Sequence, residues 1–515
     1  MTSTPPSVNP RLFEPPPKVI RTTFNPAVLI ETEGQEFSAI LGALALREAD
    51  QRLGWSEALA AKLHDPRRQD KVRYPMRELL LERLHVMVSG NPTQDTCDCQ
   101  AHDPAARAAA WCRPGPRVAD ERLASQPTAS RLQDTLADPR NLEILRQSAG
   151  DLVARHLFAA GQDRKVKTAA LDVDALPIVG YGHQEGLAYN DYYREKVFLP
   201  LVAMLAPNGH YDSPRQGDGI VYAKLHGGLP KTASERLDFI RAALPAARAC
   251  AECVILRADA EFATLEEMNA LSNDGQYFVM RHKNVEWIEK LGAPFAVRPP
   301  GRPPSEGYHQ VIDLGFARWH PEWEKPLRIL VCVEDGPDEL GRLSLTPRVF
   351  FLVANVPDSI LDADETLEFY RQRGTFESRL GEWNAVVGAN LSSERLVEND
   401  ATLQLACLAF NFANLLRGEL EAASDPRPAP PANQAEGMGL RRFQEVFLNV
   451  PGVVERRGRQ LVFKLTRGLG AWWLALWGRF DKWLASPRFS APSPVYARRW
   501  VPPPAHSFLW FRPRL

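Results

Sequence analysis

Residues 164–281 alternate strand-like and helix-like segments in a fixed order, and this order constrains the fold more than any other feature. Three strand-like runs come first, KTAALDVDALPIVG, VFLPLVAMLAPNGHY and GIVYAKLHGG, with a turn signal at Asn208 and Gly209. Two helix–strand pairs follow, TASERLDFIRAALPAARA with ECVILRAD, and TLEEMNALSND with QYFVMRH. Thr232 or Ser234 is expected to cap the first helix. Three antiparallel strands and then helix–strand alternation predict an α/β fold.

The segments around this core differ from it in composition, and 515 residues suffice for roughly two to four domains. Helical patterns such as EFSAILGALALREADQRLG precede the core, and β-type runs separated by Pro and Gly, such as LRILVCVED, interrupt it. The predicted organisation is a disordered Pro-rich arm (1–30), a helical region (31–160), the first part of the core (161–284), a β-rich segment (285–363), the second part of the core (364–420), a linker (421–439) and a basic C-terminal segment (440–515).

Charge, cysteine usage and hydropathy exclude several classes of protein. The formal net charge of −1 shows no basic excess over the whole chain, although residues 439–515 hold fourteen Lys and Arg against three Asp and Glu. Seven scattered cysteines argue against a secreted disulfide framework. The strongest apolar run, GLGAWWLALWG, is shorter than the ~20 residues that a transmembrane helix needs. We therefore expect a cytoplasmic protein that has no membrane partner.

The stretch YRQRGTFE places three polar side chains on one side of a predicted helix that runs from residue 364 to about 385. Tyr370, Arg373 and Glu377 are three and four residues apart, so they share one stripe. A neighbouring apolar stripe, expected to dock on a core, consists of Phe369, Phe376, Leu380 and Trp383. The polar stripe is therefore expected at the edge of the buried surface, beside a cleft. An ordinary amphipathic helix with a salt bridge is the alternative.

Carboxylates occur where the elements of an α/β fold would bring them together. Asp172 and Asp174 alternate with apolar residues in the first strand, so both side chains point to the same face. Asp259 ends the strand ECVILRAD, and Glu377 lies on the helix described above. Carboxylates that converge at strand ends repel one another unless a cation binds, so this group predicts a Mg²⁺ site for phosphoryl transfer. A solvated aspartate or a salt bridge is the alternative for each residue singly.

These residues resemble a known family. The spacing of Tyr370, Arg373 and Glu377, together with LDVD and LRADAEF, resembles the motifs of bacterial insertion-sequence transposases that have an Asp-Asp-Glu active site on a ribonuclease H-like fold. The resemblance is closest to insertion-sequence family thirteen-eighty, within the superfamily whose third motif is Tyr-x2-Arg-x3-Glu. It extends in order from about residue 30 to 467 through ERLASQPTASR, ATLQLACLAFNFANLLR and LRRFQEVFLNVPGVV.

The resemblance implies a catalytic and metal-binding triad of Asp174, Asp259 and Glu377, with Asp172 as a neighbour or alternative first aspartate. The metal would be Mg²⁺, for which Mn²⁺ can substitute. Arg373 would bind a DNA phosphate through two hydrogen bonds, and Tyr370 would contact the DNA backbone or orient Arg373. The segment 285–363 would be the β-rich insertion domain of the ribonuclease H-like core.

The resemblance also implies the partners. The helical region would bind the terminal inverted repeats of the element, with Arg131, Arg441 and Arg442 among the DNA-binding residues, although SQPTAS before Arg131 fits a plain helix cap equally well. Cut-and-paste transposition into target DNA, by a dimer on paired ends in the bacterial nucleoid, would follow. The chain departs from the family at Ala175 and Leu176, where a small hydroxyl residue usually follows the first aspartate, at Trp383, which is often Lys, and at GNPTQDTCDC (90–99).

Two further functions stay open. The first is a transposase relic whose altered first motif no longer holds metal and that only binds DNA. The second is a structure-selective nuclease on the same fold. Intact inverted repeats that flank several identical copies of the gene would favour the active enzyme over the relic.

Other candidate sites are weaker. Cys97, Cys99, His102 and Cys112 could bind zinc, but their spacing is not that of a standard finger, and a Cys-bearing loop is the alternative. The loop GHQEG (182–186) is expected near the active site, with no role predicted for His183 or Glu185. The tryptophans expected to pack a C-terminal helix are Trp472, Trp473, Trp477 and Trp483.

Overall fold

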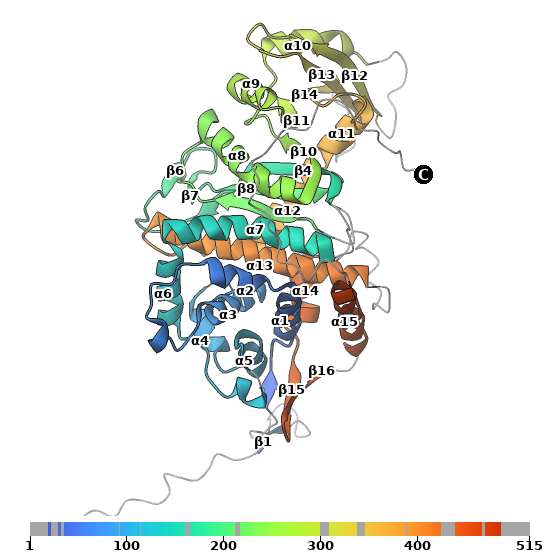
Figure 1. The fold of residues 1–515 in the computed structure, drawn as a ribbon. Helices are drawn as coiled ribbons and strands as arrows, with labels where there is room; N and C mark the ends of the chain where they lie inside the picture. The colour runs from blue at the N-terminus through green and yellow to red at the C-terminus, as the bar shows by residue number, and fades with distance from the viewer. Residues whose placement is uncertain are drawn as a thin grey trace, which may run out of the picture.

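The structure is a computed structural model of the chain (Figure 1). It describes residues 19–21, 29–31, 36–91, 93–113, 115–159, 165–211, 217–298, 308–336, 346–386, 388, 390–423, 438–465 and 469–485. Most of the predicted Pro-rich arm, most of the predicted linker and residues 486–515 of the basic segment lie outside the described residues. None of the helices in the described ranges has the length and apolar character that crossing a bilayer requires.

A mixed sheet of eight strands forms the centre of the described structure. Its order is β12-β13-β14-β11-β10-β4-β8-β9. The strands are β4 (Val166–Ala175), β8 (Leu201–Pro207), β9 (Gly219–Lys224), β10 (Ala251–Ala258), β11 (Tyr277–His282), β12 (Tyr308–Ala317), β13 (Leu327–Asp335) and β14 (Arg348–Ala354). The central strands are nearly continuous apolar runs because helices cover the sheet on both sides.

The five strands β9, β8, β4, β10 and β11 come from the predicted α/β core. β4 pairs antiparallel with β8 and parallel with β10, and β10 pairs parallel with β11. The three-strand start and the two helix–strand units are therefore confirmed. Asn208 and Gly209 adopt positive φ values of 57° and 81°, as a turn there requires. The chain does not close a tight hairpin at this turn, because β9 begins only at Gly219.

The predicted β-rich segment continues the same sheet. It supplies β12, β13 and β14, and β14 pairs antiparallel with β11 of the core. The segment also contains α10 (Glu286–Gly292) and η4 (Ala293–Phe295). Figure 1 shows these elements at the end of the molecule opposite the N-terminal helices.

Two capped helices cover one face of the sheet. α8 (Ala233–Cys250) and α9 (Leu265–Asn273) pack with alternate side chains of β4, β8 and β10 in one apolar core. Thr232 is the cap of α8, and it forms a capping box with Glu235. Of the two predicted caps, the structure thus confirms Thr232.

The opposite face of the sheet packs against α13 (Leu396–Ala422). This helix is buried over most of its length because it lies between the sheet and the N-terminal helices (Figure 1). α7 (Pro139–Ala159) runs beside α13 and also contacts β9. Its middle part, residues 405–413, is apolar except for Asn411, as an interior position favours, and Asn411 forms hydrogen bonds with the backbone of Ile220 in β9.

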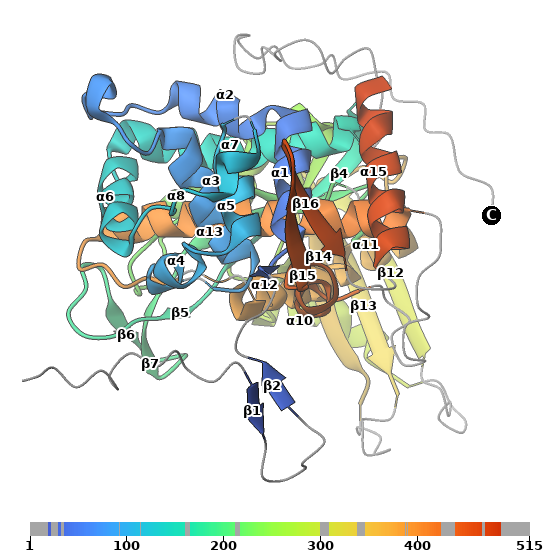
Figure 2. The same cartoon turned by 90° about the horizontal axis from the view of Figure 1, so that it is seen from below.

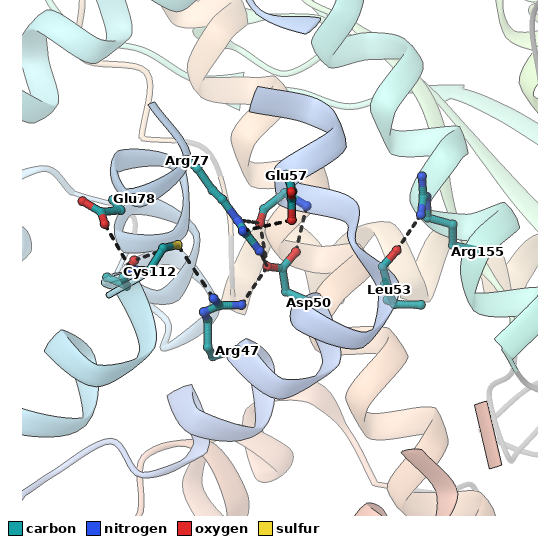
Figure 3. A network of polar contacts seen from close by, with 10 residues as sticks. Arg47, Asp50, Leu53, Glu57, Arg77, Glu78, Cys112 and Arg155 are labelled. Atoms are coloured by element: carbon teal, nitrogen blue, oxygen red, sulfur yellow. Dashed lines mark hydrogen bonds and ion pairs between the residues drawn. The ribbon is translucent and has the colours of Figure 1, made fainter. Parts of the chain in front are cut away.

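The N-terminal region is helical, as predicted. The elements are α1 (Gly42–Leu53), α2 (Trp55–Lys62), η2 (Gln69–Lys71), α3 (Met76–Val88), α4 (Asp95–Gln100), α5 (Pro104–Ala110), η3 (Pro116–Ala119) and α6 (Gln126–Leu136). Asp50, near the end of α1, accepts hydrogen bonds from the backbone N–H and the hydroxyl of Ser56, at 2.8 and 2.6 Å. Arg47 and Arg77 approach the same carboxylate at 3.4 Å, and Arg155 of α7 donates to the last carbonyl of α1 (Figure 3).

The helix predicted from residue 364 to about 385 is divided in two. α11 (Ala363–Arg371) begins with a capping box of Asp362 and Glu365, and α12 (Arg373–Val386) follows after Gln372. The predicted apolar stripe is confirmed, since Phe369, Phe376, Leu380 and Trp383 are all buried.

The C-terminal segment folds back onto the N-terminal region. It contains α14 (Leu440–Phe443), the π-helical turn η5 (Gln444–Leu448), β15 (Gly452–Arg457), β16 (Gln460–Leu465) and α15 (Gly470–Ala485). β15 pairs with β3 (Phe37–Ser38), and Figure 2 shows the β15–β16 hairpin beside the N-terminal helices. The four tryptophans of α15 belong to the core or pack against it, as predicted. β1 (Val19–Arg21) pairs with β2 (Leu29–Glu31).

Candidate active site at one edge of the central sheet

Asp174 and Asp259 lie at the same edge of the sheet. Asp174 is the penultimate residue of β4, and Asp259 directly follows β10. β4 and β10 are parallel neighbours, so their carboxyl ends reach the same edge. The backbone N–H of Glu261 donates to the Asp259 carboxylate at 2.9 Å, which fixes the turn after β10.

Arg373 joins this edge to α12. Its Nη2 donates to Asp174 Oδ2 at 2.6 Å, and its Nη1 donates to the carbonyl oxygen of Val173 at 3.2 Å. Its Nε lies 3.5 Å from Glu377 Oε1, one turn further along the helix. The structure therefore brings the predicted triad of Asp174, Asp259 and Glu377 to one region, with the Arg373 guanidinium between two of its members.

The electrostatics of the group depend on burial. The pKa of the Asp174 carboxyl is raised to about 6, chiefly by burial and also by the negative charges of Asp259 and Glu377, while Arg373 opposes the rise. Burial lowers the pKa of Arg373, but the charges of Asp174 and Asp259 outweigh burial, and the net shift is upward. A second positive charge would thus favour the ionised form of Asp174.

The oxygen donors suit Mg²⁺ in chemical type, since this ion prefers carboxylate oxygens. Among the described residues, however, no three His, Cys, Asp or Glu side chains lie close enough to hold a metal ion. In this arrangement the Arg373 guanidinium, and not a cation, contacts Asp174 Oδ2. The residues therefore fit the ion in chemical type, although their side chains are not gathered around one point in this structure.

Asp172, the alternative first aspartate, lies in the interior of the sheet. Arg257 donates to both of its oxygens, at 2.7 and 2.6 Å, and the Tyr211 hydroxyl donates to one of them at 2.6 Å. The side chains of Asp172 and Arg257 are fully buried. Asp172 is absent from the residues that line the cleft, so the geometry favours a structural ion pair for Asp172, and its assignment as a metal ligand stays a prediction.

Arg257 was missed by the sequence reasoning because its pairing with Asp172 depends on the register of the two strands. The parallel register places Arg257 of β10 directly beside Asp172 of β4. Arg257 also donates to the carbonyl oxygens of Gly209 and Phe369, so it connects the turn after β8 with α11. Asp172 and Arg257 therefore connect β4 and β10 with the turn after β8 and with α11.

A cleft of ≈ 390 Å³ opens beside Asp259 and Glu377. Besides these carboxylates it is lined by Ala260, Arg281, Glu334, Arg348, Phe350, Tyr370, Arg371, Arg373 and Gly374. Four of the lining side chains are arginines, and within the described part of the chain Arg281 and Arg348 form no ion pair with a carboxylate. Burial raises the pKa of the Tyr370 hydroxyl to about 12, which keeps it a hydrogen-bond donor. The sequence predicted Tyr370 and Arg373 but not the arginines of β11 and β14.

The other predicted DNA-binding residues lie on different elements. Arg131 is exposed on α6, which begins after Ser125, although the Ser125 side chain does not cap the helix. Arg441 and Arg442 are exposed on α14, where Arg442 lies 3.5 Å from Glu445. No described contact joins these three side chains to the cleft.

The possible zinc ligands are not gathered. Cys97 is buried in α4, and burial raises the pKa of its thiol to about 11. Cys112 lies 3.7 Å from an Arg47 nitrogen, and its backbone N–H donates to Glu78 at 3.0 Å (Figure 3). His102 instead pairs with Arg107 at 3.0 Å.

The loop GHQEG has a structural role that the sequence did not reveal. Glu185 accepts a hydrogen bond from the backbone N–H of Leu396, the first residue of α13, at 3.0 Å. Gln184 donates to the carbonyl oxygens of Leu391 and Ser393. The loop therefore fixes the start of the central buried helix.

Comparisons with known proteins identify the family. A family model described as transposase DDE domain group 1 matches residues 20–471, whereas no curated protein matches the chain. Among solved structures, the chain is similar to a piggyBac transposase, determined by cryo-EM in a synaptic complex with hairpin DNA. That similarity has 9% identity and a TM-score of 0.37 over 87% of this chain and 82% of the other, and at this level it carries no argument. Because the family model covers most of its length, the chain belongs to the DDE transposases of group 1.

Proposed function

We propose that the chain binds the ends of its own element and cleaves and transfers DNA strands by metal-dependent phosphoryl transfer. The observation that carries this proposal is the convergence of Asp174, Asp259 and Glu377 beside an arginine-lined cleft, in a chain of the DDE transposase family. The family as a whole implies DNA cleavage and transfer. The Tyr370, Arg373 and Glu377 spacing supports the narrower assignment to the Tyr-Arg-Glu group and to insertion-sequence family thirteen-eighty.

The strand order supports a ribonuclease H-like core. The first three strands of the core are consecutive and antiparallel, and the next two add on the other side of β4 in parallel. In this arrangement the first aspartate lies on the central strand and the second on its parallel neighbour. The glutamate then approaches from a helix that follows the sheet in the sequence, as Glu377 does on α12.

Mg²⁺ would be held by the carboxylate oxygens of Asp174, Asp259 and Glu377. A divalent ion bound there supplies positive charge to the attacking and leaving oxygens of an in-line displacement at phosphorus. The protein's own contribution is to hold the three carboxylates in place. Asp174 is fixed at the end of a buried strand, Asp259 by the turn after β10, and Glu377 by a helix whose apolar side is buried.

Arg373 would exchange partners during the reaction. Its three donor groups point to Asp174, Val173 and Glu377, and its side chain is almost completely buried. A contact of Nη1 and Nη2 with a DNA phosphate would compete with their contacts to Val173 and Asp174, and release of Asp174 would leave its carboxylate available to a cation. We infer that Arg373 holds the carboxylates in place before DNA and metal bind, and that it turns to the phosphate afterwards.

The arginines of β11 and β14 would receive the DNA backbone. Arg281 and Arg348 line the cleft together with Asp259 and Glu377, and the Arg281 guanidinium lies 5.6 Å from the centre of the Phe350 ring. Phosphates next to the scissile one would be neutralised there, which places the strand across the carboxylates. A dimer on paired inverted repeats, acting on target DNA, completes the proposal.

A second candidate function rests on the contact between Arg373 and Asp174. A relic that binds DNA without cleaving it would have this ion pair as its permanent arrangement. Ala175, which follows Asp174, donates its backbone N–H to the Asp174 carboxylate and offers no side-chain hydroxyl. The two candidate functions differ in whether the ion pair between Arg373 and Asp174 opens when DNA and metal bind.

One experiment separates them. Purified protein is incubated with its own element ends and Mg²⁺, and the cleaved strands are mapped, with Asp259→Asn as the control. The enzyme produces nicks at the element tips that the variant does not produce. Binding of the ends without any nick by the wild type, at all Mg²⁺ and Mn²⁺ concentrations, would leave the relic.

A further inference from the structure

A chain of buried charges contacts α12 on the side that faces away from the cleft. Arg373 and Glu377 of this helix line the cleft, whereas Arg379 and Glu382 do not. Arg379 is two residues after Glu377, and at about 100° per residue it points to nearly the opposite side of the helix. The Arg379 side chain is 8% exposed and that of Glu382 is 18% exposed. Both side chains therefore lie where α12 meets the rest of the protein.

The charges alternate in sign along this chain. Arg379 lies between two carboxylates, with its Nε 3.7 Å from Asp218 Oδ2 and its Nη1 3.6 Å from Glu382 Oε2. Glu382 Oε1 accepts a hydrogen bond from Arg417 Nη1 at 2.8 Å. Arg417 Nη2 donates to the side-chain oxygen of Asn414, whose nitrogen donates to the carbonyl oxygen of Asp218 at 3.1 Å. Asp218 directly precedes β9 and Arg417 belongs to α13, so the chain connects α12 to both elements.

Glu382 also contacts the start of α14. Its Oε1 accepts a hydrogen bond from the backbone N–H of Leu440, the first residue of that helix. Arg417 reaches the same place, since its Nη1 donates to the carbonyl oxygen of Met438 at 3.4 Å. One carboxylate oxygen thus joins α12, α13 and α14, which come from different parts of the sequence.

Continuity with the preceding helix does not fix the position of α12. The helix begins at Arg373, after the interruption at Gln372 that separates it from α11. Its buried apolar side holds it against the core, but apolar contacts are non-directional, whereas charge-assisted hydrogen bonds are directional. Replacement of a buried ion pair by apolar side chains is often neutral for stability. Such a chain therefore suits a role in fixing the rotation and the axial position of α12, on which the place of Glu377 depends.

We propose that Glu382 is a positioning residue, which fixes α12 against α13 and α14 so that the Glu377 carboxylate reaches the metal site. This inference rests on the proposed function and adds a residue that acts only through another. Misplacement of a reacting group by about 1 Å can cost about 100-fold in rate. Loss of a side chain that orients a metal ligand costs about 10- to 100-fold in metal affinity or activity.

The test compares variants that remove a buried ion pair without leaving one charge alone. Glu382→Leu with Arg417→Met removes the contact to α12, and apolar side chains of similar size take its place. The matched control is Arg146→Met with Asp400→Leu, which removes the ion pair between α7 and the other end of α13. The reference for a lost metal ligand is Glu377→Gln.

Three quantities are measured for each protein. They are the free energy of unfolding in urea, the rate of cleavage with all element ends bound, and the affinity of Mn²⁺ for the complex with pre-cleaved ends, taken from the electron paramagnetic resonance signal of free Mn²⁺. We expect the Glu382 double variant to be about as stable as the wild type but to cleave about 10- to 100-fold more slowly. Its Mn²⁺ affinity should fall toward that of Glu377→Gln, and the control pair should keep the rate and the affinity of the wild type.

Wild-type cleavage and Mn²⁺ affinity in the folded double variant overturn the proposal. If that variant does not fold, Glu382→Asp decides in the same way, because it keeps the charge while its shorter side chain cannot keep both contacts. Slower cleavage with unchanged Mn²⁺ affinity also overturns the proposal, since Glu377 would then be in place, and so does an equal loss in the control pair. Failure of the wild type to cleave overturns the proposed function itself, whereas equal cleavage by the wild type and the double variant overturns the positioning role alone.

Discussion

Replacing Asp172 by alanine tests whether the two aspartates of β4 have separate roles. Asp172 accepts two hydrogen bonds from Arg257 and one from Tyr211, and the side chains of both ion-pair partners are fully buried. Without Asp172 the Arg257 charge stays buried and loses its paired carboxylate, while the carbonyl oxygens of Gly209 and Phe369 remain as hydrogen-bond acceptors. Removal of one partner from a buried ion pair costs about 3–5 kcal/mol. Since domains are stable by about 5–15 kcal/mol, the variant should be close to unfolding.

The matched variant is Asp174→Ala, two residues further along the same strand. Asp174 is partly exposed, and the Arg373 charge would keep Glu377 and the carbonyl oxygen of Val173 as partners, so we expect Asp174→Ala to lose less of the free energy of unfolding than Asp172→Ala. Cleavage, in contrast, should disappear. Urea unfolding followed by tryptophan fluorescence gives the stabilities, and strand mapping gives the activities.

A double variant provides the control. Asp172→Leu with Arg257→Met replaces the pair by apolar side chains of similar size, and such replacements are often neutral or stabilising. The double variant should therefore be more stable than Asp172→Leu alone. The reasoning is refuted if Asp172→Ala unfolds within 1 kcal/mol of the wild type, or if Asp172→Ala is inactive but fully stable while Asp174→Ala cleaves.

Four further predictions follow from the site. Asp259→Asn should abolish cleavage and keep binding of the repeats, and near-normal cleavage by this variant would remove Asp259 from the triad. Burial raises the pKa of Asp174 to about 6, above its ordinary 3.8, so the folded state binds this proton more tightly than the unfolded state does. The protonated carboxyl therefore stabilises the folded state fully below about pH 4, and this stabilisation is lost as the pH rises through 6. The free energy of unfolding of the wild type should thus fall by up to roughly 3 kcal/mol over this range relative to Asp174→Asn, and parallel pH profiles would contradict the shift. Arg373→Lys should reduce the rate of cleavage more than tenfold, which corresponds to a barrier that is about 1.4 kcal/mol higher or more. The reason is that an ammonium cannot reproduce the planar set of donors that Arg373 uses. Equal rates for the two proteins would exclude that role. Arg348→Glu should weaken the binding of element ends and make the affinity less dependent on salt concentration. The control Lys290→Glu, at an exposed position, should change neither property. Identical salt dependence in the two variants would place the DNA elsewhere.

The fold of the core could be predicted because local pattern and long-range pairing agree there. Apolar runs such as residues 254–256 form buried strands, and Thr232 caps α8 where its sequence signal indicated. The apolar stripe from Phe369 to Trp383 is buried, although the helix is interrupted at Gln372. Such features depend on residues that are neighbours in the sequence.

The electrostatic partners could not be predicted, because they depend on register and on contacts between distant segments. Asp172 and Asp174 look equivalent in LDVD, yet one faces Arg257 and Tyr211 and the other faces Arg373. Nothing in the periodicity of β4 distinguishes them. Register would have shown the pair with Arg257, but register requires the strand order first.

The basic C-terminal segment shows the same limit. The resemblance placed DNA-binding residues here, Arg441 and Arg442, but it did not reveal that the described part packs β15 against β3 and buries Phe480 and Trp483. Truncation after Glu436 would therefore expose core surface as well as remove charge. Charge reversal at Arg441, which is exposed on α14, tests the DNA contact without this complication.

The most direct test of the account is to locate the metal in the protein. Fe²⁺ is bound in place of Mg²⁺ in the complex with element-end DNA, and peroxide with ascorbate then cleaves the protein backbone close to the ion. The account predicts fragments that end near Asp174, Asp259 and Glu377, and their loss in Asp259→Asn. Fragments confined to other segments, such as residues 97–112, or an unchanged pattern in the variant, would contradict the assignment of the catalytic site.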